Sequence, residues 1–330
     1  MVKAAVIRID RNKLGRLWRA AFVLLVGTWL ITLLLRTDFF PDNTAGLWLH
    51  PETWLFLAGW LLLPALLGAL WRWNLVFSSG VRIPLGVALS IQGLAWGGRY
   101  LPGKAGIWLA KVSIAGRYGA GWQQLGHSVV VEQILFLLGG VLIGIVMMPW
   151  SAILGFVEWD HSWWSVIQSV SVSGMFPVAQ AALVLSLIAA AFVSMILVAR
   201  LLSVGFRWFE WPLWGALLGG HMLAHILVGL TLFPLVALIV PEAASILGIN
   251  GVIAALALAN VAGIAAVFAP AGLGVREVVL AGFLAVGAVY PEALAVAAFL
   301  RLVTFMADVV FAGGAWLMGG VLQSRIRRHV

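Results

Sequence analysis

The sequence predicts an all-α polytopic membrane protein that forms a single transmembrane domain over residues 1–330. Hydrophobic residues make up 63% of the chain and charged residues only 10%, whereas soluble domains carry about 25% charged residues. The mean hydropathy is +1.07. The 18 tryptophans suit helices that end at two membrane interfaces, where amphipathic rings settle. This composition leaves little room for a soluble domain.

The net charge of +8 is concentrated at the two ends of the chain. A basic N-terminus (1–17) precedes the first apolar run, and a basic tail (323–330) follows the last one. The positive-inside rule therefore places both termini in the cytoplasm, and we expect no nucleic-acid partner. A secretory signal is the alternative at the N-terminus, but the run Ala20–Leu35 is long for one and no A-x-A-like cleavage site follows. The absence of cysteine excludes thiol chemistry, disulfides and cysteine-bound metal.

About eight transmembrane helices follow from the apolar runs, because a bilayer core needs about 20 apolar residues per helix. The expected spans are Trp18–Leu35, Thr53–Phe77, Leu125–Pro149, Val178–Arg200, Trp211–Val240, Ala243–Ala269, Arg276–Tyr290 and Ala293–Leu322. This topology puts 18 of the 20 Lys and Arg at the cytoplasmic side, all but Arg36 and Arg301. The run Arg276–Tyr290 is short, and a half-helix is the alternative for it.

Two Pro-Gly breaks interrupt this pattern and predict one or two re-entrant or broken helices. The first, Gly98-Arg-Tyr-Leu-Pro-Gly-Lys104, lies between the short apolar runs Ile83–Gly98 and Ala105–Ala110. The second is Ala269-Pro-Ala-Gly-Leu-Gly-Val-Arg-Glu277. Proline cannot continue a helix, and glycine adopts backbone angles that other residues resist. Inside a bilayer such a break must be buried in protein or line a wet cavity.

The second break has the ingredients of an anion site. The helix that restarts near Val275 would point free N–H groups into the break, where the Arg276 guanidinium also lies. We expect Arg276 and the amides near Gly272 and Gly274 to hold a phosphate, while Glu277 orients the guanidinium or pairs with a cationic headgroup. The alternative is an ordinary cytoplasmic arginine followed by an acid favoured by the helix dipole.

Basic residues also surround the first break. Arg99 and Lys104 flank Pro102-Gly103 and are candidate headgroup ligands, although a plain cytoplasmic turn would contain the same residue types. Lys111 and Arg117, further on, are expected to extend toward anionic lipid at the inner leaflet.

Three ionisable residues lie inside apolar runs: Glu132, Arg301 and Asp308. Each costs roughly 2.5–3.5 kcal/mol on insertion scales, so a functional role with a partner is the first interpretation. Arg301 and Asp308 are seven residues apart on one helix face, about 10 Å along the axis. Glu132 or Glu277 could bridge them. A structural ion pair that locks helices together is the alternative.

The two breaks also indicate an internal repeat. Pro102–Gly106 and Pro270–Gly274 each precede by about thirty residues a charged residue in an apolar helix, Glu132 or Arg301, and each helix has a double glycine, as in two-halved transporters. His221 and His225 share a helix face at a spacing able to bind metal, but no acid accompanies them in that helix. We therefore expect no metal and no cofactor.

These motifs resemble those of the lysylphosphatidylglycerol synthase transmembrane-domain family, the flippase-like proteins. The likeness covers nearly the whole chain, and the residues that stand in the family pattern are Arg117, Glu132, Asn260, Arg276, Glu277 and Arg301, together with the Arg99–Lys104 break. The resemblance implies a multi-spanning bacterial inner-membrane protein. Members that make lysyl lipid carry a soluble aminoacyl-transferase domain after this region. None follows within these 330 residues, so we expect no synthase activity.

Three function hypotheses remain at this stage. The first is a flippase-like lipid translocator in which an anionic phospholipid or other phosphate-bearing lipid meets Arg276, Arg99 or Lys104, while Glu132, Glu277 and Arg301 line or gate the path. The second is an intramembrane enzyme acting on lipid or polyprenyl phosphate, and the third is a scaffold subunit of a lipid pathway. The chain has no G-x-x-x-x-G-K-[ST] segment that would let it use ATP.

Overall fold

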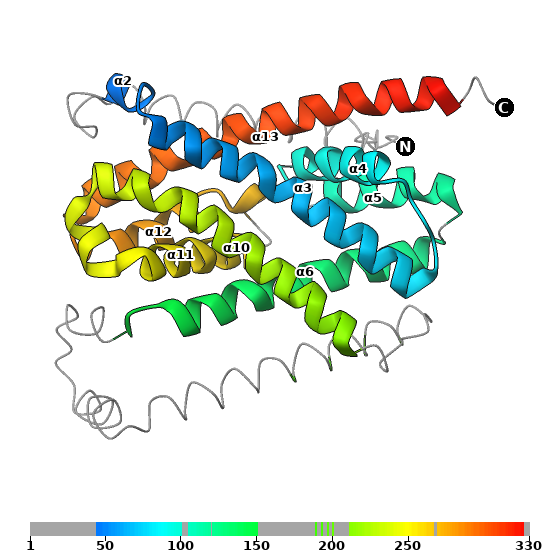
Figure 1. The fold of residues 1–330 in the computed structure, drawn as a ribbon, viewed down its shortest axis with the longest axis horizontal. Helices are drawn as coiled ribbons and strands as arrows, with labels where there is room; N and C mark the ends of the chain where they lie inside the picture. Colours follow the sequence, from blue (N-terminus) through cyan, green and yellow to red (C-terminus); the bar gives the residue numbers. More distant parts are fainter. Residues whose placement is uncertain are drawn as a thin grey trace, which may run out of the picture.

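The computed structural model describes residues 44–100, 105–119, 121–150, 211–266 and 269–326, together with the isolated helical positions Ala189, Val193, Leu197 and Arg200. In this part of the chain every regular element is a helix (Figure 1). The all-α class is therefore confirmed. The expected spans Trp18–Leu35 and Val178–Arg200 lie outside the described residues, apart from those isolated positions.

Five of the described helices are long and apolar enough to cross a membrane. They are α3 (Pro51–Ser79), α6 (Trp122–Met147), α10 (Trp211–Ile239), α11 (Pro241–Ala265) and α13 (Tyr290–Ile326). Each matches one of the expected spans to within a few residues. The chain is thus a multi-pass membrane protein, since a lipid-facing segment must satisfy its own backbone groups and the helix does so.

Local sequence signals set the ends of these helices. Pro51 and Glu52 open α3, where proline loses no needed hydrogen bond and an acid suits the helix dipole. Gly80, at φ 71°, ends the same helix in the left-handed conformation. Gly248 bends α11 with φ 60° and ψ −179°, a region that is essentially restricted to glycine.

The remaining described helices are short. They are α2 (Thr44–Leu47), α4 (Leu85–Gly98), α5 (Ala105–Ala115), α12 (Val275–Leu284) and the 3-10 turns η3 (Gly116–Tyr118) and η5 (Pro270–Gly272). The expected seventh span, Arg276–Tyr290, is wrong. Helix α12 has 10 residues and reaches about 15 Å, which is half of a bilayer core of about 30 Å. It is the half-helix that the sequence left as an alternative.

Helices α4 and α5 form the hairpin that was expected around the first break, and α11 with α12 forms a second one. In Figure 1 the two hairpins occupy opposite halves of the bundle, and their tips meet near its middle. Glycines allow α4 and α5 to touch: a Cβ added to Gly106 would lie 2.3 Å from the Gly98 carbonyl oxygen. The first hairpin therefore depends on contact between two backbones.

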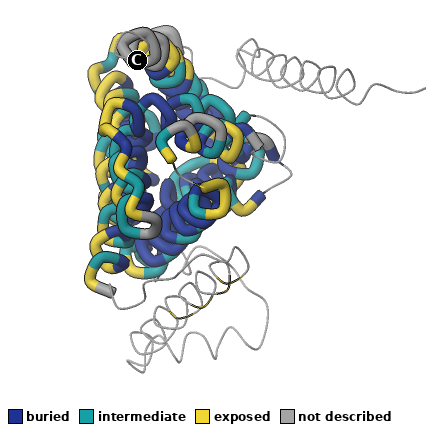
Figure 2. Tube along the Cα trace, turned by 90° about the vertical axis from the view of Figure 1, so that its right-hand side faces the viewer, coloured by how far each residue is buried: buried dark blue, intermediate teal, exposed yellow. Residues whose placement is uncertain are grey.

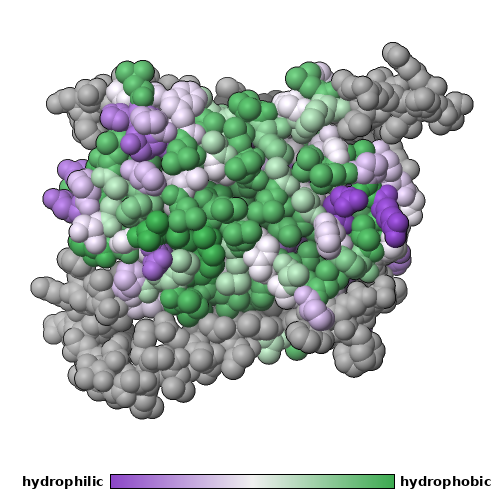
Figure 3. Space-filling view, viewed as in Figure 1, coloured by the Kyte–Doolittle hydropathy of each residue, from purple (hydrophilic) through white to green (hydrophobic). Residues whose placement is uncertain are grey.

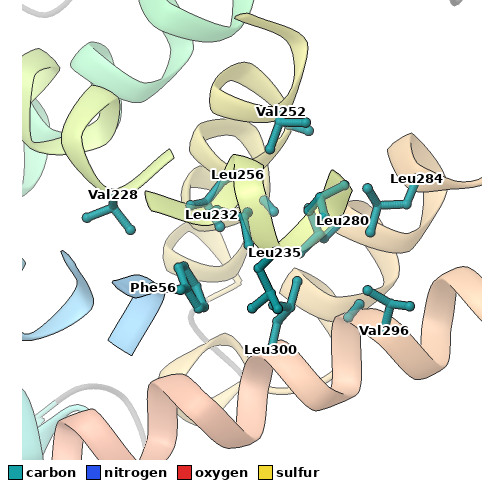
Figure 4. Packing of buried hydrophobic residues seen from close by; sticks show 14 of the residues in the cluster. Phe56, Val228, Leu232, Leu235, Val252, Leu256, Leu280, Leu284, Val296 and Leu300 are labelled. Atoms are coloured by element: carbon teal, nitrogen blue, oxygen red, sulfur yellow. The ribbon is translucent and has the colours of Figure 1, made fainter. Parts of the chain in front are cut away.

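The main core joins both halves of the chain. Phe56 of α3, Leu232 of α10, Leu256 of α11, Leu280 of α12 and Leu300 of α13 belong to one buried cluster (Figure 4). Buried residues line the inside of the bundle and exposed ones its outside (Figure 2). On the face drawn in Figure 3, hydrophobic residues fill the middle, and hydrophilic residues gather toward the two ends of the long helices, as expected for a bilayer-spanning bundle.

The proposed internal repeat receives mixed support. Both breaks are hairpin tips, and each precedes a long helix with a buried charge. The double glycines differ, however. A Cβ on Gly140 would meet Val261 at 2.5 Å, whereas one on Gly313 or Gly314 would meet nothing within 4 Å. The repeat remains a prediction.

We predict that Gly106→Ala lowers the stability of the protein by about 1–3 kcal/mol, because the added methyl group overpacks against backbone that cannot yield. Gly313→Ala is the matched control, since its Cβ would meet nothing and alanine is the better helix former by about 0.5–1 kcal/mol. The thermal unfolding midpoint of each purified variant in one detergent measures the difference. Equal midpoints would contradict the close contact between α4 and α5.

Candidate functional site

The two hairpin tips are joined by a backbone hydrogen bond. The N–H of Ala271, in η5, donates to the carbonyl oxygen of Arg99 at the end of α4, with an N···O distance of 3.0 Å. Ala271, Gly272 and Gly274 all have positive φ, which for Ala271 is a strained conformation. A Cβ on Gly272 would lie 2.6 Å from the Cα of Gly263 in α11. The second tip thus folds tightly back on the helix that precedes it.

The Asp308 carboxylate holds the first tip to α13. Its Oδ1 accepts from the indole N–H of Trp60 at 2.9 Å and of Trp96 at 2.7 Å. Its Oδ2 accepts from the Arg99 guanidinium, with which it also forms an ion pair, and from the Tyr100 hydroxyl. The carboxylate is 1% exposed, so these four donors replace the water that an ionised buried group needs.

Arg301 and Glu277 connect the second tip to α13. The Arg301 Nε lies 3.4 Å from Glu277 Oε1, and a terminal nitrogen of Arg301 donates to the Tyr100 hydroxyl at 3.4 Å and to the Ala271 carbonyl at 3.5 Å. Glu277 Oε2 accepts from the N–H of Gly274 at 2.7 Å, which caps α12. Neither Glu277 Oε1 nor Arg301 Nε has a well-aligned hydrogen bond in the described part of the chain.

Arg276 is the third guanidinium of this group and is only 5% exposed. Its Cζ lies 4.4 Å from the centre of the Trp60 ring, a cation–π distance. Among the described residues no carboxylate lies within ion-pair distance of it and no group accepts a hydrogen bond from it. Arg276 is therefore a buried cation that this part of the protein leaves without a counter-ion.

We call Arg99, Arg276, Arg301, Glu277 and Asp308 the central charged cluster. Three guanidinium groups face two carboxylates, which leaves one net positive charge among these residues at the meeting point of the hairpins. A buried charge without a partner is costly. The cluster is therefore electrostatically suited to receive an anion.

Lys111 and Glu132 form a second, neutral group. They make an ion pair across α5 and α6, with side chains 1% and 3% exposed. The Gln92 amide donates to Glu132 at 3.4 Å, and the Lys111 ammonium lies 4.6 Å from the Trp71 ring centre. The expectation that Lys111 extends toward lipid is wrong, because Glu132 neutralises it inside the bundle. The Arg117 side chain and Lys104 lie outside the described structure.

A cavity of about 70 Å³ lies between the two groups. Arg99 and Trp96 line it on the side of the central charged cluster, and Lys111 and Glu132 line it on the other. A single water needs about 10–15 Å³ measured in the same way, so the cavity holds several waters or one small polar group. Arg276 does not line the cavity but lies next to its wall. A Cβ added to Gly263, which lines the cavity, would lie 3.2 Å from the Cβ of Arg276.

The structure thus assembles most of the predicted site residues. Arg99, Arg276, Glu277, Arg301, Gly272 and Gly274 lie together, and Glu132 faces the same cavity as Arg99. Two expected roles need correction. The N–H groups of Gly272 and Gly274 already donate to Ala269 and Glu277, so they are not free for a phosphate. Glu277 pairs with Arg301, not with Arg276.

The prediction that Glu132 or Glu277 bridges Arg301 and Asp308 is also wrong. Tyr100 connects them, because its hydroxyl donates to Asp308 and accepts from Arg301. Trp60 and Trp96 were missed because the sequence rule assigns tryptophan to membrane interfaces. Trp60 stands well inside its span, where a buried indole N–H needs an acceptor. That position is the signal that could have identified it as a partner of Asp308.

The two histidines of α10 are used structurally. His221 Nδ1 lies 2.7 Å from the Leu217 carbonyl oxygen, and His225 Nε2 lies 3.1 Å from that of Phe136. The described residues contain no group of three or more His, Asp or Glu able to hold a metal ion. A scan against models of known protein families and a search of curated proteins both find no match.

We predict that Asp308→Ala lowers the unfolding free energy by about 3–5 kcal/mol, because it leaves the buried Arg99 guanidinium without its partner. Glu292→Gln removes an exposed acid from the start of the same helix and is expected to change stability by less than about 0.5 kcal/mol. Denaturant titration in detergent, followed by tryptophan fluorescence, compares the two. Similar losses in both variants would contradict the anchoring role of Asp308.

A double-mutant cycle tests the Lys111–Glu132 pair. We expect Glu132→Leu or Lys111→Met alone to cost about 3–5 kcal/mol, and the double variant to recover much of that loss because no unpaired charge remains. The unfolding midpoints of the four proteins in one detergent give the coupling energy. Additive losses would mean that the two side chains are not paired inside the bundle.

Proposed function

We propose that this membrane protein binds the phosphate of an anionic lipid headgroup at the central charged cluster and carries the lipid between leaflets. The observation that supports this most directly is the Arg276 guanidinium, which is buried beside Trp60 and lacks a counter-ion among the described residues. A lipid phosphate would supply the missing negative charge. Arginine suits this role because its planar fork pairs with two phosphate oxygens at once.

The surroundings of Arg276 favour a ligand over a purely structural role. Arg99 Nε is also buried without a hydrogen-bond acceptor in the described structure, whereas Arg301 Nε faces Glu277 Oε1 at 3.4 Å. A cavity that Arg99 lines lies next to them. Donors that the protein leaves unused, close to a cavity, are what a bound headgroup would need.

The position of the cluster fits transport. Two hairpins from opposite halves of the bundle meet there (Figure 1), and broken helices that meet near the bilayer midplane form the substrate sites of many transporters. In this proposal Glu132, paired with Lys111, lines the cavity opposite Arg99, and Glu277 holds Arg301 in place.

The similarity of the motifs to the flippase-like lysylphosphatidylglycerol synthase transmembrane region supports the same class of substrate. It also supports a place in a bacterial inner membrane with both termini in the cytoplasm, in line with the basic ends of the chain. A scaffold subunit is the second candidate, since the four hydrogen bonds to Asp308 would also serve to lock helices.

Reconstitution into liposomes that contain fluorescent phosphatidylglycerol tests the proposal. Arg276→Gln is expected to slow exchange between leaflets roughly tenfold to hundredfold, because a hydrogen bond to a charged group is worth roughly 1.5–3 kcal/mol. Arg276→Lys should give an intermediate exchange rate, since lysine keeps the charge but cannot pair with two phosphate oxygens as the planar guanidinium does. The rate is read from the fraction of lipid accessible to an added quencher over time.

Arg200→Gln is the matched control, because it removes an equal charge from an exposed position and should leave the rate unchanged. Unfolding midpoints of all variants are measured in parallel. If wild type, Arg276→Gln and empty liposomes exchange lipid at one rate, translocation is refuted. A loss of stability in Arg276→Gln without any change in rate would favour the scaffold.

A further inference from the structure

A second hollow lies at the far end of α3, away from the central charged cluster. It has a volume of about 260 Å³ and is lined by Arg72, Trp73, Val76, Phe77 and Arg82. None of these residues lines the central cavity. Residues 72, 73, 76 and 77 share one face of the helix, since side chains four apart are neighbours.

The chain reversal after α3 builds this hollow. Gly80 ends the helix in the left-handed conformation, and its N–H donates to the Val76 carbonyl at 2.8 Å. The following residues turn back, so that Ile83 packs in a buried cluster with Trp71 and Leu75. Arg72 Nε then donates to the Ile83 carbonyl. The hollow is thus held open by an anchored turn.

The polar part of the hollow is purely cationic. Both charged residues that line it are arginines, and no carboxylate lines it. Arg82 is exposed, and the described residues provide no acceptor for it or for the terminal nitrogens of Arg72. Two guanidinium groups that line one hollow repel each other, and an anion between them would remove that cost.

The rest of the hollow is apolar and faces outward. Trp73 is 54% exposed, and its ring centre lies 5.7 Å from that of Phe77. These residues end the candidate span Pro51–Phe77, so the hollow lies at the level where the hydrocarbon core gives way to headgroups. A free phosphate would leave this apolar face unused, whereas a lipid acyl chain would cover it.

We propose that this hollow is a binding site for one anionic phospholipid, with the phosphate on Arg72 and Arg82 and an acyl chain along Trp73 and Phe77. The site is independent of the proposed translocation path. The arginines would select lipids of net negative charge over zwitterionic lipids with the same chains. The positive-inside rule places it in the cytoplasmic leaflet, where anionic lipids attract basic residues.

Native mass spectrometry of the full-length, delipidated protein tests the site, with titration by dioleoyl phosphatidylglycerol or dioleoyl phosphatidylcholine. Wild type should bind phosphatidylglycerol more tightly. Arg82→Gln should weaken that binding about fivefold and Arg72→Gln/Arg82→Gln about thirtyfold, because each basic residue near an anionic surface is worth about 1 kcal/mol. Phosphatidylcholine binding should not change.

Two controls and the choice of the single variant keep the result specific. Arg200→Gln removes an exposed arginine elsewhere and should have no effect; an equal effect would mean diffuse surface charge and would overturn the site. Arg82→Gln touches no hydrogen bond of the described structure, so it remains decisive if the double variant fails to fold. Arg82→Gln is also made in an Arg276→Gln background, which removes the proposed central site. The fivefold loss of phosphatidylglycerol affinity should persist there.

Two further outcomes would refute the proposal. One is equal affinity of wild type and Arg82→Gln for phosphatidylglycerol. The other is displacement of the bound lipid by inorganic phosphate at the affinity of the lipid itself, since the hollow would then be a simple anion site. Neither outcome depends on whether the protein moves lipid between leaflets.

Discussion

The meeting of two hairpin tips inside the bundle is the constraint on which the rest of the structure depends. A helix that stops at membrane depth exposes backbone groups to an environment without bulk water. Here each tip supplies a hydrogen-bond partner for the backbone of the other, because the Ala271 N–H donates to the Arg99 carbonyl oxygen. Asp308 reinforces the contact by accepting from Arg99, Tyr100, Trp60 and Trp96, which lie on or beside α3 and α4. The strained Ala271 and the close glycine contacts are tolerated because this network fixes them in place.

The buried charges are treated in two different ways. Lys111 and Glu132 neutralise each other, with Gln92 and Trp71 around them. The central charged cluster instead retains one positive charge, which Arg276 carries against the face of Trp60. The aromatic ring stabilises the cation only partly, since cation–π contacts are worth about 2 kcal/mol when desolvated. The Lys111–Glu132 pair is thus neutral, whereas the central charged cluster keeps a charge that the proposed ligand would neutralise.

Arginine and tryptophan line a cavity together at two places in this protein. Inside the bundle Arg99 lies 4.2 Å from the centre of the Trp96 ring, and at the end of α3 Arg72 and Arg82 border the exposed Trp73. The interior cavity, at about 70 Å³, is smaller than the outer hollow, at about 260 Å³. The outer hollow has an apolar face formed by the exposed Trp73 and by Phe77, along which the proposed lipid would lie. In both proposals the arginines supply positive charge that a lipid phosphate would neutralise.

The sequence by itself determined the helical class, five of the spans and the first hairpin, and it singled out Arg99, Arg276, Glu277, Glu132 and Arg301 as candidate site residues. It did so because apolar length, proline, glycine and buried charge act locally along the chain. Only the tertiary structure decided the pairings. Glu277 pairs with Arg301, and Lys111 pairs with Glu132 inside the bundle. Trp60 and Trp96 donate hydrogen bonds to Asp308 and do not lie at a membrane interface. A single sequence does not fix which helices pack together, and the partner of a buried charge is set by that packing.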